Sequence, residues 1–196
     1  MPAKADRLTT YRTKRRFDAT PEPAGAVPRS RSGAGGRFVV QRHRARRLHY
    51  DFRLEVDGVM KSWAVPKGPT LDPAVKRMAI QVDDHGMAHN QYEGETVIIW
   101  DRGVYEQGGR VAWPEALERG HAVFVLHGEK LHGGFALQRT GSSAKKPQWL
   151  LIKRKDDEAR PGSDITAERP ESVVSGRPLA AARPSSGPPA RDAGRP

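Results

Sequence analysis

The clearest pattern in the chain is a strict alternation of apolar and polar residues in its first half. In the stretch LHYDFRLEV, residues 48–56, every other side chain is apolar and each residue between is polar or charged. A period of two is typical of a β-strand with one buried face. The dipeptide Asp57-Gly58 that follows is a strong signal for a two-residue hairpin turn. The stretch VMKSWAV, residues 59–65, is then expected to return as the partner strand.

Further short strands are predicted along the chain as far as about residue 155. They are RFVVQRH (37–43), KRMAIQVDDH (76–85), ETVIIWDRGVYE (95–106), HAVFVLHGEKLHGGFALQRT (121–140, with a turn at Gly128-Glu129) and QWLLIKRK (148–155). The segment WPEALERG, 113–120, is the one convincing helical turn. Many short strands at short spacing indicate a mainly β fold, a small antiparallel barrel or sandwich with one or two short helices.

Within the strand at 76–85, strict alternation puts two sets of side chains on opposite faces. One set is Met78, Ile80 and Val82, and the other is Arg77, Gln81, Asp83 and His85. The tryptophans of three strands, Trp63, Trp100 and Trp149, are expected to pack in the core.

Composition divides the chain into three parts. Residues 1–36 are basic and rich in Pro and Gly, which break regular elements, so we expect a mostly irregular leader. Residues 37–157 form the predicted domain. Residues 158–196 are rich in Pro, Arg and Ser and contain no aromatic residue, which predicts a disordered tail.

Charge and cysteine content narrow the function classes. The 196 residues carry a formal net charge of +11, which favours a polyanionic partner, with nucleic acid ahead of a membrane surface. The absence of cysteine excludes disulfides and zinc–thiolate centres. The chain has no apolar run of membrane-spanning length and no apolar stretch of a secretory signal at its N-terminus, so the cytoplasm is the simplest expected location.

The strand at 48–56 also carries candidate chemistry. His49, Asp51 and Arg53 project from one face, and the short connection RARR allows His43 to fold back beside His49. Two imidazoles and a carboxylate suit Mn, Fe, Co or Zn, and a neighbouring arginine suits a phosphate that also binds the metal. The alternative reading is the solvated face of a half-buried sheet, because an H-x5-H-x-D spacing is a weak motif by itself.

Residues 38–85, FVVQRHRARRLHYDFRLEVDGVMKSWAVPKGPTLDPAVKRMAIQVDDH, closely resemble the 3′-phosphoesterase domain of bacterial DNA ligase D. The similarity resumes in TVIIWDRGVYE and QWLLIKRKDD, and the leader LTTYRTKRRFDATPEP also resembles that family. The resemblance implies a small β-barrel that binds manganese or a similar divalent ion. It also implies removal of a 3′-terminal ribonucleoside, and then of the remaining 3′-phosphate, from DNA ends during double-strand break repair by non-homologous end joining.

The resemblance also implies roles for particular residues. The implied metal ligands are His43, His49 and Asp51, and the implied phosphate-binding residues are Arg53 and His85. Further positions of the implied catalytic site are Lys67, Arg77, Asp83, His89, Glu22 and Arg15.

Three features depart from the family pattern. His89 stands where the family usually has Tyr, and Gly94 is followed directly by ETVIIWDRG without a segment of about ten residues. The leader reads KRRF at 14–17 where an acidic residue is usual. The first two changes lie close to His85 and therefore bear on the 3′-phosphate removal step.

The sequence contains no Lys-x-Asp-Gly ligase signature and no room for a polymerase. We therefore expect a stand-alone enzyme, associated with the nucleoid, that works with a DNA ligase, a polymerase/primase and the end-binding protein Ku in trans. Two alternatives stay open at this point. One is a DNA-end binding module that has lost catalysis, and the other is a phosphoesterase for a nucleotide or an RNA 3′-phosphate.

Overall fold

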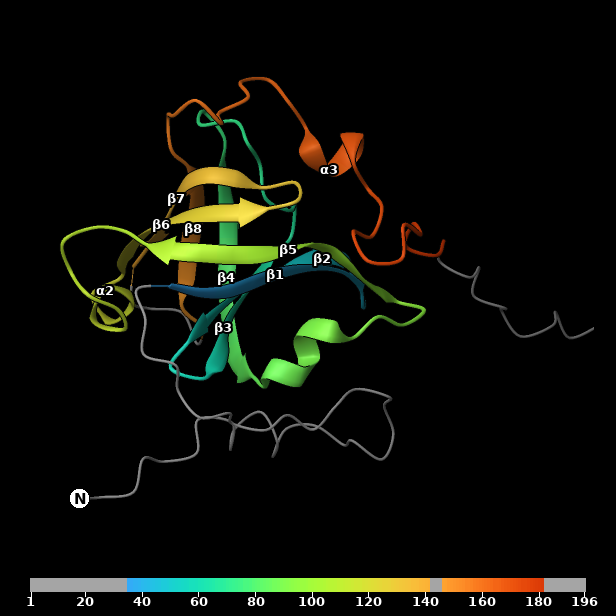
Figure 1. The fold of residues 1–196 in the computed structure, drawn as a ribbon, viewed down its shortest axis with the longest axis horizontal. Coiled ribbons are helices and arrows are strands. Elements are labelled where there is room, and N and C mark those ends of the chain that lie inside the picture. Colours follow the sequence, from blue (N-terminus) through green and yellow to red (C-terminus); the bar gives the residue numbers. More distant parts are fainter. Residues whose placement is uncertain (1–34, 142–145, 182–196) are drawn as a thin grey trace, which may run out of the picture.

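The computed structural model describes residues 35–141 and 146–181, and within them eight antiparallel strands close into a barrel (Figure 1). The neighbours around the barrel follow the order β1-β2-β3-β4-β8-β7-β6-β5. The strands are β1 (Gly35–Arg44), β2 (Leu48–Val56), β3 (Val59–Val65), β4 (Lys76–His85), β5 (Val97–Gln107), β6 (His121–Gly128), β7 (His132–Arg139) and β8 (Gln148–Lys153). The predicted mainly β barrel is confirmed. None of the described helices is long and apolar enough to cross a membrane.

The hairpins form where the sequence predicts them. Asp57 and Gly58 have φ values of 50° and 78° between β2 and β3, as a tight hairpin turn of two left-handed residues requires. The turn at Gly128 is confirmed by the hydrogen bond that its N–H donates to Leu131 O over 2.9 Å. In the β1–β2 pair, His43 lies directly opposite His49.

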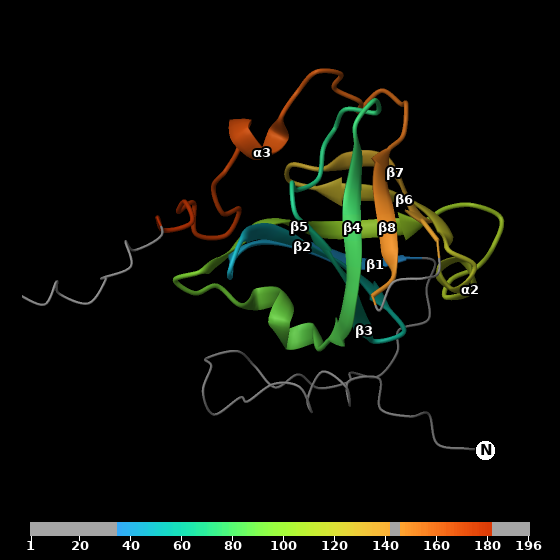
Figure 2. The same cartoon turned by 180° about the vertical axis from the view of Figure 1, so that it is seen from behind.

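The barrel interior is filled by the apolar faces of the strands. Trp63, Trp100 and Trp149 are at most 2% exposed, which confirms that they pack in the core. The short helix α2 (Glu115–Glu118) covers one end of the barrel with buried Ala116 and Leu117, and the short helix α3 (Ile165–Glu168) lies at the opposite end (Figures 1 and 2).

One departure from simple alternation occurs in β4 and concerns His85. Ser62 pairs with Val82, but Met60 pairs with His85, because the β3–β4 register shifts between these two positions. Directly opposed residues share a face, so the shift turns His85 to the face of Val82 and of Ser62. The prediction that His85 faces opposite to Val82 is therefore wrong, and the physical reason is this irregularity.

The predicted disorder after residue 157 is also wrong for residues 158–181, which we call the C-terminal strap. The strap, which includes α3, packs against one end of the barrel (Figure 1). Its side chains Ile165 and Leu179 are buried. Its backbone supplies acceptors for barrel donors: Arg169 O accepts from Trp100 Nε1 over 2.7 Å and from Lys130 Nζ over 2.9 Å. The strap is held by hydrogen bonds to its carbonyls, which amino-acid composition does not reveal. Residues 182–196 and residues 1–34 of the leader lie outside the described residues, whereas Gly35 and Gly36, which were assigned to the leader, begin β1.

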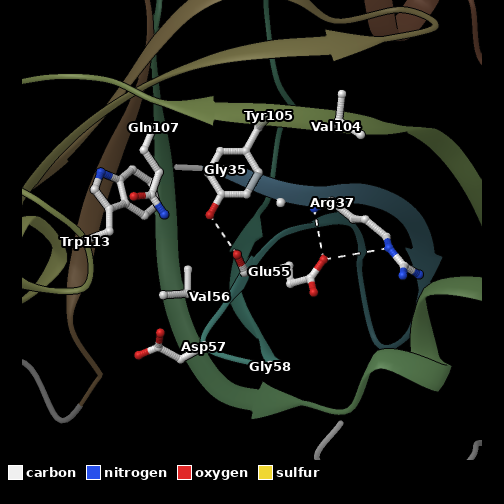
Figure 3. Close-up of a pocket in the computed structure, with 11 residues that line it drawn as sticks. Gly35, Arg37, Glu55, Val56, Asp57, Gly58, Val104, Tyr105, Gln107 and Trp113 are labelled. Atoms are coloured by element: carbon white, nitrogen blue, oxygen red, sulfur yellow. Dashed lines mark hydrogen bonds and ion pairs between the residues drawn. The ribbon is translucent and has the colours of Figure 1, made fainter. Parts of the chain in front are cut away.

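A recess of about 510 Å³ lies where β1 begins (Figure 3). Tyr105 points into it and donates a hydrogen bond to Glu55 O over 2.7 Å, and the Arg37 N–H donates to the Glu55 carboxylate over 3.1 Å. This recess and the candidate metal ligand His43 lie at opposite ends of β1, so they are separate features.

Asp101 of β5 organises the β6–β7 turn. Its fully buried carboxylate accepts hydrogen bonds from four backbone N–H groups, those of Arg102, Glu129, Lys130 and Leu131, over 2.8–3.1 Å. Burial raises the pKa of Asp101 and the four hydrogen bonds counteract that rise. Since the two oxygens accept from different N–H groups, a side chain with one acceptor oxygen cannot replace it.

We predict that Asp101→Asn lowers the free energy of unfolding by about 2–3 kcal/mol, because an amide N–H₂ would face a backbone donor. Urea denaturation followed by circular dichroism measures the loss. Glu106→Gln, at an exposed carboxylate on the same strand, serves as the control and should change stability by less than about 0.5 kcal/mol. Equal stability of the two variants would contradict this role of Asp101.

Candidate metal and phosphate site

The candidate site lies on the outer wall of the barrel, at the end of β1 and the start of β2. Cross-strand pairs place His43 opposite His49 and Gln41 opposite Asp51. Because alternate residues of a strand share a face, all four side chains project from the same side of the wall. The intervening residues Val40 and Phe52 are buried in the core, which fixes the site residues outward.

Two histidines and one carboxylate converge there. His43 Nδ1 lies 3.6 Å from Asp51 Oδ2, and His49 Nε2 lies 3.4 Å from Asp51 Oδ1. One ligand atom from each residue lies within 4.8 Å of the others, and this is the one such group among the residues that the structure describes. The spacing predicted from the sequence is therefore realised as a possible metal-binding triad.

The hydrogen bonding of His49 fits a metal ligand. Its Nδ1 lies 3.0 Å from Arg47 O, a contact in which Nδ1–H donates to the carbonyl. Nε2 therefore faces Asp51 and the centre of the triad, where a metal ion can take the place of the proton that Nε2 shares with the carboxylate. Metal-binding histidines are commonly held by such a bond from the opposite ring nitrogen. The residues present therefore fit a divalent ion with two nitrogen ligands and one oxygen ligand.

Arg53 places a positive charge beside the triad. Its side chain is only 2% exposed, and its Nη2 donates to Asp51 Oδ2 over 3.3 Å. Burial alone would raise the pKa of Asp51, but hydrogen bonds from His43 and His49 and the Arg53 charge hold that pKa well below its ordinary value. The hydrogen bond to Asp51 raises the pKa of His49, against the effect of burial. Asp51 is thus an anion that binds three cationic or polar partners.

The structure brings His85 to the same outer wall. Met60 lies opposite both Glu55 of β2 and His85 of β4, so His85 shares the face of Glu55 and Arg53. His85 is buried, and its neighbour Asp83 is half-buried on the same strand. His89 belongs to the short 3₁₀ helix η2 (Met87–Gln91), which follows β4. The catalytic roles predicted for these three residues stay predictions.

The two other predicted basic positions are placed differently. Lys67 is exposed in the connection after β3, whose last residue Val65 pairs with Tyr50 beside the site. Arg77 has the register of Ala79, which is buried in the core. Hydrogen bonds lower the pKa values of Asp72 and Asp164, and the Arg77 charge adds to that effect. Register therefore directs Arg77 to the other face of the wall from Asp51. Glu22 and Arg15 lie outside the described residues.

Gln41 is a site residue that the sequence analysis missed. It is fully buried on the outer wall beside Asp51, and its Nε2 donates to Tyr92 O over 2.9 Å. Its position two residues before His43 was the available signal, since alternate residues share a face. It connects the triad to the turn that precedes β5.

The raised pKa of His49 predicts that metal binding depends on pH. At pH values below that pKa, a metal ion must displace at least one proton from His49. The manganese affinity should therefore rise about tenfold per pH unit in this range and level off at pH values above the pKa. Manganese titrations of the whole chain at pH 6, 7 and 8, followed by electron paramagnetic resonance of free Mn²⁺, measure this slope. His127→Asn, at a half-exposed histidine paired with Glu106, should keep the slope. Equal affinity at all three pH values would contradict the prediction.

Comparison with known proteins agrees with this geometry. Residues 41–139 match the family model for the DNA ligase D 3′-phosphoesterase domain. The multifunctional non-homologous end joining protein LigD of Pseudomonas aeruginosa is 50% identical over 189 residues, covering 88% of this chain and 22% of that protein. The Mycolicibacterium smegmatis protein of the same name is 40% identical over 174 residues, covering 80% and 22%. The Mycobacterium tuberculosis LigD DNA repair protein is 39% identical over 163 residues, covering 78% and 20%.

The chain spans about a fifth of the length of these curated relatives. The matched residues include the whole triad, Arg53 and His85. On the extent of this match, the chain belongs to the DNA ligase D 3′-phosphoesterase domain family.

Proposed function

We propose that this protein is a divalent-metal-dependent phosphoesterase that processes the 3′ ends of DNA in double-strand break repair by non-homologous end joining. The observation that carries the proposal is the His43–His49–Asp51 triad with the buried guanidinium of Arg53 next to it. Family membership supports the same reading. The metal that best suits the proposal is manganese, since two imidazoles and a carboxylate suit it and the sequence resemblance implies it.

In this proposal the triad binds the metal ion, and Arg53 binds the phosphate. A divalent ion held by His43, His49 and Asp51 would supply Lewis acidity toward a phosphoryl oxygen. Arg53 and His85 then neutralise the negative charge on the remaining phosphate oxygens, which grows as water attacks phosphorus and the ester bond breaks. Asp51 holds the Arg53 guanidinium in place over 3.3 Å and keeps it from folding away from the site.

The proposed substrate is a DNA 3′ end that carries either a terminal ribonucleoside or a 3′-phosphate, and the product is a ligatable 3′-OH. The net charge of +11 supports a DNA partner, because lysine and arginine release counterions from the phosphate backbone. We also propose that the protein acts at the nucleoid in the cytoplasm. There it would work together with a DNA ligase, a polymerase/primase and Ku.

The first test uses two primer-templates, one with a single 3′-terminal ribonucleotide and one with a 3′-phosphate. We expect manganese-dependent trimming of both, which chelator abolishes and His49→Ala reduces at least about 10³-fold, because that variant removes a metal ligand. His127→Ala removes a histidine outside the triad and should keep full activity. Gel electrophoresis of labelled primers measures both steps.

The outcomes of this test separate the alternatives. Trimming that stops at a stable 3′-phosphate would mean that His89 and the short turn after Gly94 have removed only the second step. Cleavage of an RNA 3′-phosphate in preference to the DNA ends would favour the RNA enzyme. No cleavage, together with tight DNA binding in chelator, would overturn the enzyme proposal in favour of a DNA-end binding module.

A second prediction concerns Arg53. Arg53→Lys keeps the charge but loses the planar fork that binds phosphate oxygens in pairs, so kcat/KM should fall about 100-fold. Manganese affinity should stay within about threefold, because the triad is intact. Arg102→Lys, at a half-exposed arginine of the same barrel, is the matched control. Equal kcat/KM values for the two variants would show that Arg53 does not bind the reacting phosphate.

A further inference from the structure

The C-terminal strap has a second set of contacts, away from the barrel end, on the turn before β5. Arg177 Nη2 donates to Gly94 O over 2.6 Å and to Val97 O over 3.3 Å. Ser172 Oγ donates to Glu93 Oε1 over 2.5 Å. We call residues 92–97 the site turn, because they border the candidate metal site.

The site turn supports the strand that carries His43. Val97 pairs with His43 in the β1–β5 ladder, and the Arg44 N–H donates to Thr96 O over 2.8 Å. Gln41 Nε2 donates to Tyr92 O at the other end of the turn. The end of β1 is therefore held on one side by β2, which carries His49 and Asp51, and on the other side by the site turn.

Glu93 links the strap to this turn. Its carboxylate accepts from Ser172 Oγ and from the Ile99 N–H over 2.8 Å, and Arg177 Nε lies 3.9 Å from its other oxygen. Burial would raise the pKa of Glu93, but these hydrogen bonds and the Arg177 charge outweigh it, so the pKa lies below its ordinary value. The carboxylate is thus an anion whose partners come from both the strap and β5.

The strap also closes a small apolar cluster on the outer wall. The buried side chains Val39, Met60 and Ile99 pack there against Val173 of the strap and Met87 of η2. The Val173 N–H donates to Ile99 O over 2.9 Å, so the strap continues the hydrogen bonding of β5. Gln41 pairs with Ile99 of β5 on one side and with Asp51 of β2 on the other. Gln41 is therefore the one residue that separates this contact from the triad in the ladder.

We propose that Ser172 and Arg177 are positioning residues, which hold the site turn against β1 and thereby keep His43 in place to bind metal with His49 and Asp51. The proposal rests on the function proposed above. The turn after Gly94 is short, because only Glu95 and Thr96 separate the paired residues Gly94 and Val97. Arg177 supports this turn through its hydrogen bonds to the carbonyls of both paired residues. The strap thereby belongs to the functional unit, although it lies beyond residues 41–139 that match the family model.

The strap contacts fall into two groups that mutations can separate. The carbonyls of Arg169, Pro170 and Glu171 accept hydrogen bonds at the barrel end, whereas the side chains of Ser172 and Arg177 contact the site turn. Arg177→Ala and Ser172→Ala therefore remove the second group and leave the first intact. Arg160→Ala is the matched control, because within residues 35–141 and 146–181 the Arg160 guanidinium bonds to its chain neighbours 157–159 and does not reach the site turn.

The test measures three quantities on the full chain. Amide hydrogen exchange of Arg44, followed by NMR without metal, reports whether the site turn holds β1. Electron paramagnetic resonance gives the manganese affinity, and primer trimming gives kcat and KM. For Arg177→Ala we expect about tenfold faster exchange at Arg44, about tenfold weaker manganese binding and a lower kcat, with KM for DNA within about twofold. Arg177→Lys should recover part of each loss, and Arg160→Ala should match the wild type.

Two results would overturn the proposal. One is unchanged exchange at Arg44 and unchanged manganese affinity in both Arg177→Ala and Ser172→Ala. The other is an equal rise in exchange at core amides such as that of Phe124 in both variants, which would show a general loss of stability. A wild-type chain that cleaves neither substrate would count against the proposed function alone, because the exchange measurement needs neither metal nor turnover.

Discussion

The antiparallel register between β1 and β2 is the constraint on which the rest of the site depends. One face of this pair is buried, and the same register that turns Val40 and Phe52 inward places His43, His49 and Asp51 outward. A slip by one residue would move every apolar side chain to the outer wall. The hydrophobic core therefore specifies the geometry of the triad, and the tight turn at Asp57-Gly58 fixes the register of the next pair.

Asp51 is the electrostatic centre of the outer wall. It contacts two histidines and a buried arginine, so its negative charge is compensated in the metal-free protein. A divalent ion would bind the nitrogen and oxygen atoms that face one another in the triad and would leave the Arg53 charge next to a bound phosphate. The arrangement favours anionic ligands that bring their own negative charge, as a DNA 3′ end does.

Local sequence patterns were sufficient for the features that depend on neighbouring residues. Alternation in 48–56 predicted the strand and the shared face of His49 and Asp51, and the dipeptide Asp57-Gly58 predicted the hairpin turn. The tryptophans pack in the core as expected. The orientation of His85 was not predictable, because it depends on a register shift opposite Met60 that no local pattern marks. The strap was missed for a related reason: Trp100 and Lys130 hold it through its backbone carbonyls, which every residue has.

The central claim is that the outer face of the β1–β2 hairpin is a divalent-metal centre. The most direct measurement is an anomalous difference map from crystals of the full chain soaked in Mn²⁺. We predict one strong peak about 2.0–2.3 Å from a ring nitrogen of His43, a ring nitrogen of His49 and a carboxylate oxygen of Asp51. A map without a peak at this triad, from crystals in which the triad is open to solvent, would contradict it.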